Sequence, residues 1–241
     1  MKNKFLQLFF SFIVILSGFS ASAQTTVPAL ITSNQVWDIS GSPYVINQNS
    51  YIGTGVSVIV MPGVEVKTTG SYKITIDGEF QARGKWDSVI TISTVLLEFT
   101  NKSKDYDPST GKGAYFNYCN ISGDGSGSKS ISVATTSLKV DNCNFTNSYF
   151  SIYLQNAYPY DTVTTNINNS KFYGYSMGYG YPISGSIMES KMTVTNCYFN
   201  TKGSIYTYGN IVFKNNTFNG LGRLESGRSE ERRVGKECLR L

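Results

Sequence analysis

A short string of residues recurs along the chain, and this repeat constrains the fold more than any other feature of the sequence. Each copy reads apolar, any, apolar, any, Asn, small, any, apolar, although residue 165 is Thr in the first apolar place. An earlier copy at residues 114–121 has Tyr118 where the others have Asn. Alternation with a period of two residues predicts β-strands with one buried face. The four clearest copies are residues 138–145, 165–172, 192–199 and 211–218.

Apolar pairs continue upstream of these copies. We assign the pairs that begin at Val64, Phe80 and Leu97 to the same ladder of strands, with successive members 16 to 27 residues apart, and the pairs at 58, 74 and 90 to a second ladder. Short strands at such intervals predict the coils of a solenoid, because one coil buries its apolar side only by stacking on the next. Asn suits the bend, since its short amide tolerates left-handed backbone and stacked amides hydrogen-bond along the ladder.

Over about residues 35–220 this pattern resembles the right-handed parallel β-helix family, often called pectin-lyase-like. Residues 58–66 and 74–84 resemble the opening coils of many secreted bacterial members. The predicted fold is therefore an all-β, right-handed parallel β-helix that is truncated at its C-terminus. A β-sandwich also has short alternating strands, but it does not need the same corner residue at every turn. The aromatic content of 14% agrees with extended structure and not with disorder.

The first 23 residues have the pattern of a secretory signal peptide. Lys2 and Lys4 precede an apolar run over residues 5–16, and small residues at 21–23 predict cleavage before Gln24. The run is shorter than the ~20 residues that a membrane span needs, and no second run follows, so the mature chain is expected to have no span. The predicted location is extracellular, either free or at the cell surface.

The tail of the chain differs in composition from the rest. Residues 228–238 match the translation of a common sequencing adapter, so we expect residues 221–241 to be a non-native or disordered tail. The preceding residues are expected to form an N-terminal cap and first coil (24–56) and then further coils of the β-helix (57–220). The signal segment holds two lysines, and the tail from 228 holds five basic and three acidic residues. The 14 basic and 13 acidic groups that remain lower the net charge from +5 to +1, which argues against a nucleic-acid partner.

Three cysteines occupy one repeat position, the first after the bend. An oxidising compartment permits a disulfide between Cys119 and Cys143 if their coils are adjacent. The alternative is a stack of small buried thiols in which Ser170 and Asn216 fill the same place on other coils. We favour the stack, because Cys197 makes the number odd and three cysteines cannot all pair. Without His or Cys-x-x-Cys spacing, a structural zinc site is not expected.

Catalytic residues are not expected in the visible coils. Hydrolases of the resembled family use clustered aspartates with a histidine, and its lyases use calcium-binding aspartates with an Arg or Lys base. This chain has no histidine, and no family catalytic residue carries over. Asp105 and Asp107 are weak calcium candidates in a loop that we expect to be a solvated turn; no other cofactor is expected. No two carboxylates stack among the predicted outward residues, which are Glu98, Tyr115, Lys139, Asn166, Thr193 and Val212.

A Tyr-rich stretch supplies the candidate binding residues. Tyr173, Tyr175, Tyr179 and Tyr181 lie within residues 172–182 among Gly, Ser, Met and Phe. Tyr has a flat apolar face and a polar tip, which suits stacking on sugars or protein adhesion, although such a stretch also packs on its own solenoid. We therefore predict a non-catalytic module for adhesion or for binding an extracellular glycan or surface protein, and leave its oligomeric state open.

Two other functions stay open. One is a carbohydrate-active enzyme, a polysaccharide lyase or glycosidase, whose site lies in loops or beyond the truncation. The other is a structural stalk. A groove with converging acids, or with an acid beside Arg83 or Lys171, favours the enzyme, and one walled by Tyr and Asn favours binding. A stalk needs no groove.

Overall fold

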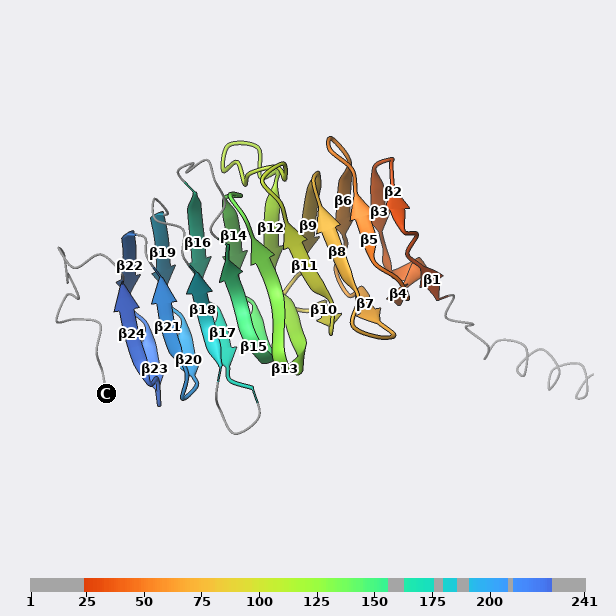
Figure 1. Ribbon diagram of the computed structural model, residues 1–241. Coiled ribbons are helices and arrows are strands. Elements are labelled where there is room, and N and C mark those ends of the chain that lie inside the picture. Colours follow the sequence, from red (N-terminus) through yellow and green to blue (C-terminus); the bar gives the residue numbers. More distant parts are fainter. Residues whose placement is uncertain (1–23, 156–162, 176–179, 186–190, 208–209, 227–241) are drawn as a thin grey trace, which may run out of the picture.

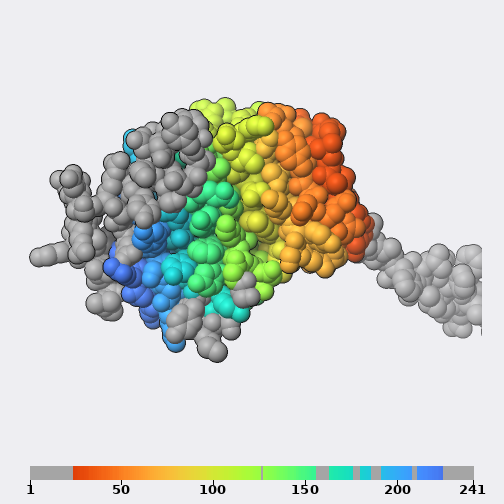
Figure 2. Space-filling model, in the orientation of Figure 1, coloured from red at the N-terminus to blue at the C-terminus, as the bar shows by residue number. Residues whose placement is uncertain are grey.

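Parallel β-strands wound into successive coils make up the fold (Figure 1). The computed structural model describes residues 24–155, 163–175, 180–185, 191–207 and 210–226. Besides strands, the described residues form one short 3-10 helix, η1 (Ile39–Gly41), which Asp38 caps by accepting a hydrogen bond from the Ser40 amide. The coils follow one another along the molecule as bands of successive colour (Figure 2).

Each coil contributes strands to three ladders, so the solenoid is three-sided. The first ladder is a sheet of eight strands: β3 (Gln35–Trp37), β6 (Ser57–Val60), β9 (Glu79–Arg83), β12 (Ala114–Asn117), β14 (Leu138–Asp141), β16 (Thr164–Asn168), β19 (Lys191–Thr195) and β22 (Asn210–Lys214). The second comprises β1 (Thr25–Thr26), β4 (Tyr44–Ile46), β7 (Glu65–Thr68), β10 (Ile90–Ser93), the starts of β13 (Cys119–Val133) and β15 (Asn144–Leu154), β17 (Lys171–Tyr173), β20 (Tyr198–Asn200) and β23 (Thr217–Asn219).

The third ladder comprises β2 (Leu30–Ile31), β5 (Ser50–Ile52), β8 (Lys73–Ile76), β11 (Leu96–Phe99), the ends of β13 and β15, β18 (Tyr181–Gly185), β21 (Ser204–Thr207) and β24 (Arg223–Ser226). The two long strands β13 and β15 pass through both the second and third ladders and join them into one sheet of sixteen strands. Pairing of β24 with β21 continues the parallel pattern through Ser226, and residues 1–23 and 227–241 lie outside the described residues.

The all-β parallel solenoid predicted from the repeat is confirmed, and a sandwich of antiparallel sheets is not formed. In the first ladder Phe116, Val140, Ile167 and Val194 pair in register on four consecutive coils. All four side chains are 0% exposed, as the alternation predicted. The intervening residues point outward, so the core is an axial column of apolar side chains.

The assignment of upstream pairs to ladders was wrong. The pair at Val64 lies just before and on β7, and the pairs at Phe80 and Leu97 lie on β9 and β11; these strands belong to the second, first and third ladders. Likewise the pairs at 58, 74 and 90 lie on β6, β8 and β10 and share no ladder. The alternation shows which residues of a strand point inward, but it does not show to which of the three ladders the strand belongs. In this part of the chain, 16 or 17 residues span less than one full coil, so successive pairs fall on different ladders. Consequently Glu98 is not in the row of Tyr115, whose neighbour is Gln81.

The bend between the first and second ladders is made by one left-handed residue in each later coil. The φ angles are 55° at Asn142, 47° at Asn169, 54° at Asn196 and 53° at Asn215, and Tyr118 takes the same conformation with 47°. The Asn169 amide donates to Asn142 Oδ1 at 2.6 Å. The Asn142 amide donates to Asn117 Oδ1 at 2.8 Å. The left-handed bend is therefore confirmed, but of these amides only that of Asn169 bonds to another bend residue, because Asn196 donates to Asn168 Oδ1 at 3.0 Å.

Aromatic rings, all buried except the partly buried Phe218, stack along the axis directly after this bend. The ring centroids of Phe145, Phe172, Phe199 and Phe218 are 4.8, 4.9 and 5.0 Å apart in turn, and the planes tilt by 12° or less. These distances match the ~4.8 Å separation of neighbouring strands. The stack follows from register, because the same apolar position faces the same point on every coil.

The residue after each bend also points inward. Cys119, Cys143 and Cys197 are buried free thiols, and Ser170 and Asn216 fill the same position. Small side chains therefore stack at this position, as expected, and in this structure the three thiols are not bonded to one another. Burial raises the pKa of the Cys197 thiol to about 11, and burial followed by the neighbouring Cys143 thiol raises the pKa of Cys119.

A charge placed in the column should abolish folding. Val194→Asp buries a carboxylate with no partner, and we expect it to lower the free energy of unfolding by more than about 4 kcal/mol. Thr193→Asp is the control, because Thr193 is next in the strand but points outward. Thermal unfolding followed by circular dichroism measures both. A cooperative, wild-type-like melt of Val194→Asp would contradict the inward assignment.

The left-handed bend gives a second expectation. Asn169→Val places a β-branched side chain at positive φ, whereas Asn169→Gly removes that steric conflict. Both variants lose the amide hydrogen bond to Asn142. We therefore expect the valine variant to be roughly 1–2 kcal/mol less stable than the glycine variant in urea unfolding. Equal stabilities would show that the bend does not depend on backbone conformation.

Candidate functional site

The predicted tyrosines do not form one site. Tyr173 lies on β17 in the second ladder, where its ring packs edge-on against Tyr198 with centroids 6.2 Å apart. Tyr181 lies on β18 in the third ladder and stacks on Phe150 with centroids 5.4 Å apart. The ring of Tyr175 lies against Gly125, where a Cβ atom would come within 2.7 Å of it. Tyr179 lies outside the described residues.

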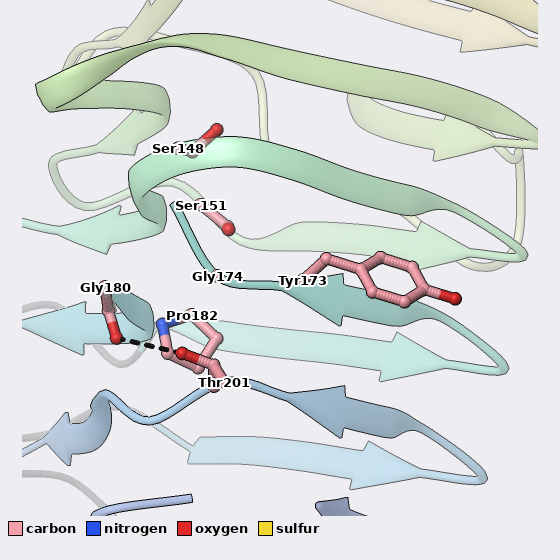
Figure 3. Close-up of a pocket in the computed structure, with 7 residues that line it drawn as sticks. All are labelled: Ser148, Ser151, Tyr173, Gly174, Gly180, Pro182 and Thr201. Atoms are coloured by element: carbon pink, nitrogen blue, oxygen red, sulfur yellow. Dashed lines mark hydrogen bonds between the residues drawn. The ribbon is translucent and has the colours of Figure 1, made fainter. Parts of the chain in front are cut away.

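A small hollow beside Tyr173 is lined mainly by hydroxyl groups and backbone (Figure 3). It has essentially no room for a water molecule, and the Tyr173 ring points away from it. Its hydroxyl groups already bond within the protein, since Ser148 contacts Ser130 and Thr201 Oγ1 donates to the Gly180 carbonyl at 3.4 Å. This hollow offers a ligand little room and few free polar groups. Its lining residues are Ser148, Ser151, Tyr173, Gly174, Gly180, Pro182 and Thr201.

A larger groove lies where the second ladder turns into the third. It encloses about 480 Å³. Such a volume is within the usual range for sites that bind small molecules. It crosses several consecutive coils. Its charged lining residues are Lys73 on β8 and Asp124 and Lys129 on β13. The lining residues are Asn49, Ser71, Tyr72, Lys73, Thr94, Leu96, Gly123, Asp124, Gly127, Ser128 and Lys129.

Unequal coil lengths create this groove. Only Thr94 and Val95 connect β10 to β11, whereas the next coil carries the extra residues 123–128, Gly-Asp-Gly-Ser-Gly-Ser, within β13. The pairing of β13 with β15 shifts register twice across these residues. Gly125 and Gly127 adopt φ angles of 106° and 72°, which favour glycine. The short coil is therefore the floor and the bulged coil is a wall.

Thr94 on this floor has a strained backbone. Its φ of 61° is unusual for a β-branched residue. Its hydroxyl donates to the Ser93 carbonyl at 2.7 Å and accepts from the Thr68 hydroxyl at 2.9 Å, and these contacts hold the conformation. Among the described residues Thr94 is the one β-branched residue at positive φ, and strained backbone of this kind concentrates at functional sites.

Opposite charges meet at the edge of the groove. Lys73 Nζ lies 2.7 Å from Glu98 Oε2, which also accepts a hydrogen bond from the Thr75 hydroxyl at 3.1 Å. Burial raises the pKa of Glu98, but the hydrogen bond and charge of Lys73, with Thr75 and Lys129, outweigh it and hold the pKa below its usual value of 4.5. Glu98 is therefore ionised at neutral pH. With Asp124 it gives the groove and its edge two acidic groups, equal in number to the lysines Lys73 and Lys129.

An aromatic surface continues the groove along the third ladder. We use this name for Tyr149, Phe150, Tyr153 and Tyr181, which are all half-buried. Phe150 contacts Tyr153 with centroids 5.2 Å apart, and Tyr149 contacts Tyr181 at 5.5 Å. Lys129 joins the two regions, because it lines the groove and its ammonium lies 3.9 Å from the centre of the Tyr153 ring.

Sequence reasoning found only one member of this surface. Tyr181 was a predicted binding residue. Phe150 and Tyr153 were not predicted, because they lie in a strand with no unusual composition. In the structure Lys129, Phe150 and Tyr181 are register partners on three consecutive coils. To identify Phe150 and Tyr153 from the sequence, one would have to know the strand register of the third ladder, which pairs Phe150 with Tyr181.

The aspartates proposed for calcium accept hydrogen bonds from protein groups, Asp107 within its own loop and Asp105 from the start of the next coil. Asp107 accepts hydrogen bonds from the Ser109 amide and hydroxyl at 2.8 and 2.7 Å and from the Thr110 hydroxyl at 2.8 Å. Bonds from Ser109 and then Thr110 lower the pKa of Asp107 to about 2. Asp105 accepts from the Ser137 amide at 2.5 Å. Within the described ranges no three Cys, Asp or Glu side chains gather in a way that would hold a metal ion.

A further charged network holds the 100–113 loop against the first ladder. Glu79 is buried, accepts a hydrogen bond from the Gly113 amide at 2.8 Å and lies 3.5 Å from Lys104 Nζ. Arg83 donates to Gln81 and, at 3.1 Å, to the Gly111 carbonyl. These groups thus fasten a loop, and Arg83 does not line the groove.

Comparison of the chain with protein-family models, with curated proteins and with solved structures found no match. None of the helical residues described here forms a segment long and apolar enough to cross a membrane. The function is therefore inferred from the geometry of the groove and the aromatic surface.

The ion pair at the groove predicts a pH response. Because the pKa of Glu98 is lowered on folding, its stabilising contribution is present above pH 4.5 and is lost as the pH falls through the lower folded value. Lys73→Met removes the nearest cation, so the pKa of Glu98 should rise relative to wild type. A carbon-13 NMR titration of the carboxyl group measures it, with Lys67→Met as the control. An identical Glu98 titration in Lys73→Met would contradict the assigned cause.

Proposed function

We propose that the chain is a secreted or surface-displayed module, of the right-handed pectin-lyase-like type found in bacteria, that binds an extracellular glycan without cleaving it. The ligand lies across the groove and the aromatic surface on the outer face of the third ladder. The observation that carries this proposal is their continuity through Lys129, which places a polar groove beside rings that a sugar can stack on. A stalk that only spaces other domains has no need of such a groove.

The aromatic rings supply the stacking surface. Phe150 and Tyr181 are stacked on consecutive coils with planes 16° apart, and Tyr153 packs against the same Phe150 ring. Half-buried rings that are held by their neighbours lose little conformational entropy on binding. The apolar face of a pyranose ring is suited to such a surface, while Tyr hydroxyls at its rim are available to the sugar hydroxyls.

The polar lining favours a neutral glycan. Lys73 is paired with Glu98, and the lining holds one further cation, Lys129, and one further carboxylate, Asp124, so the formal charges of the groove cancel and do not attract a polyanion. Asn49, Ser71 and Ser128 provide amide and hydroxyl groups that exchange hydrogen bonds with sugar hydroxyls. A few placed polar groups beside apolar surface are typical of small-molecule sites.

Binding of neutral oligosaccharides to the full chain tests the proposal. A glycan array selects a ligand, and calorimetry then compares variants. Tyr153→Ala and Phe150→Ala should each weaken binding about 10-fold or more, because each removes a stacking face of roughly 1–3 kcal/mol. Tyr115→Ala is the matched control, since Tyr115 lies on the outer face of the first ladder against Tyr106 and Lys139.

Three outcomes would overturn this function. The first is that no neutral glycan binds, and the second is that a glycan binds equally well to Tyr153→Ala and wild type. The third is cleavage: mass spectrometry of the bound oligosaccharide after incubation would show shortened or unsaturated products, and these would support the alternative of a polysaccharide lyase or glycosidase. Unchanged oligosaccharide with tight, Tyr153-dependent binding supports the binding module.

A further inference from the structure

Two of the three buried thiols lie next to each other on adjacent coils. Asn120 and Asn144 are register partners in β13 and β15, so the residues just before them, Cys119 and Cys143, lie side by side. Both side chains point into the solenoid, with exposures of 1% and 0%. The Cys143 Sγ donates to the Asp141 carbonyl at 3.1 Å, and the Cys119 Sγ donates to the Asn117 carbonyl at 3.4 Å. The two thiols therefore occupy equivalent places.

The third thiol is out of reach of this pair. On the coil after Cys143 the same position holds Ser170, whose hydroxyl accepts a hydrogen bond from the Cys143 amide at 3.1 Å. Cys197 follows one coil later, where its amide donates to Asn216 Oδ1 at 2.8 Å. Cys143 and Cys197 are thus two strand spacings apart, about 10 Å, which exceeds the reach of a disulfide. The odd number of cysteines is therefore no obstacle to one specific pair.

We propose that Cys119 and Cys143 form a disulfide when the chain folds in an oxidising compartment, and that this bond links two consecutive coils. Neighbouring parallel strands are ~4.8 Å apart, which lies within the 4.4–6.8 Å between Cα atoms that disulfides span. The proposal rests on secretion and is independent of glycan binding. In the reduced structure the two cysteines already lie on adjacent coils, in the positions that the disulfide requires.

The chemistry balances with a dithiol–disulfide oxidant. The two thiols lose two protons and two electrons, the Sγ–Sγ bond forms, and the disulfide of the oxidant is reduced to a dithiol. Thiolate is the attacking species, and burial in the closed solenoid disfavours it. The bond therefore forms while the coil that carries Cys143 is still docking onto the coil that carries Cys119.

Refolding of the full chain with reduced and oxidised glutathione tests this site. We use a Cys238→Ser background, because Cys238 lies outside the described residues. After refolding, the protein is denatured, alkylated with iodoacetamide and digested for peptide mapping. The expected result is a peptide pair linked through Cys119 and Cys143, with Cys197 alkylated. A reductant should lower the melting temperature by roughly 5–10 °C.

Two variants separate the pair from the third thiol. Cys197→Ser should keep the link and the response to reductant, whereas Cys119→Ser should lose both and leave Cys143 alkylated. Ser is tolerated at this position, as Ser170 shows on another coil, so loss of folding is not expected. Alkylation of all three cysteines, or a link that includes Cys197, would overturn the proposal, and neither result depends on glycan binding.

Discussion

The bend between the first and second ladders is the constraint on which the later coils depend. A single residue at φ near 50° turns the chain so that the next side chain enters the core, and this happens at the same place on five consecutive coils. Because L-residues avoid this conformation, the position selects Asn, whose amide then bonds to the neighbouring coil. Fixing the bend fixes the register, and register brings Phe145, Phe172, Phe199 and Phe218 into one stack.

This constraint explains how much of the fold could be predicted from the sequence. From residue 114 onward each coil carries the bend residue, and the predicted ladder agrees with the observed pairing through Ile211. Upstream of residue 114 no Asn marks the bend. Alternation therefore showed that the pairs beginning at Val64, Phe80 and Leu97 are buried, but not which of the three ladders each pair belongs to. All three sides of a coil show the same period-two pattern, so the pattern alone does not assign a strand to a ladder. A bend residue such as Asn, repeated at the same place in each coil, makes that assignment possible.

The candidate site was less predictable, because it arises where the repeat is broken. The groove depends on a two-residue connection in one coil and a Gly-rich bulge in the next, and the length difference has no periodic signature. The strained Thr94 and the Lys73–Glu98 pair become neighbours only through coil stacking. Tyr181 was identified by composition, yet its partners Phe150 and Tyr153 required the third ladder, whose strands carry no bend marker.

The inner and outer faces of the solenoid thus answer to different requirements. Inward residues are constrained by neighbours on both sides, so a charge without a partner there costs more than the fold can tolerate. Outward residues need only remain compatible with a strand, and they are free to change from coil to coil. Stacked rings such as Phe150 and Tyr181, 5.4 Å apart on consecutive coils, then offer a chain-like ligand equivalent contacts at successive positions. A solenoid built for regular stacking is in this way suited to bind a regular polymer along its side.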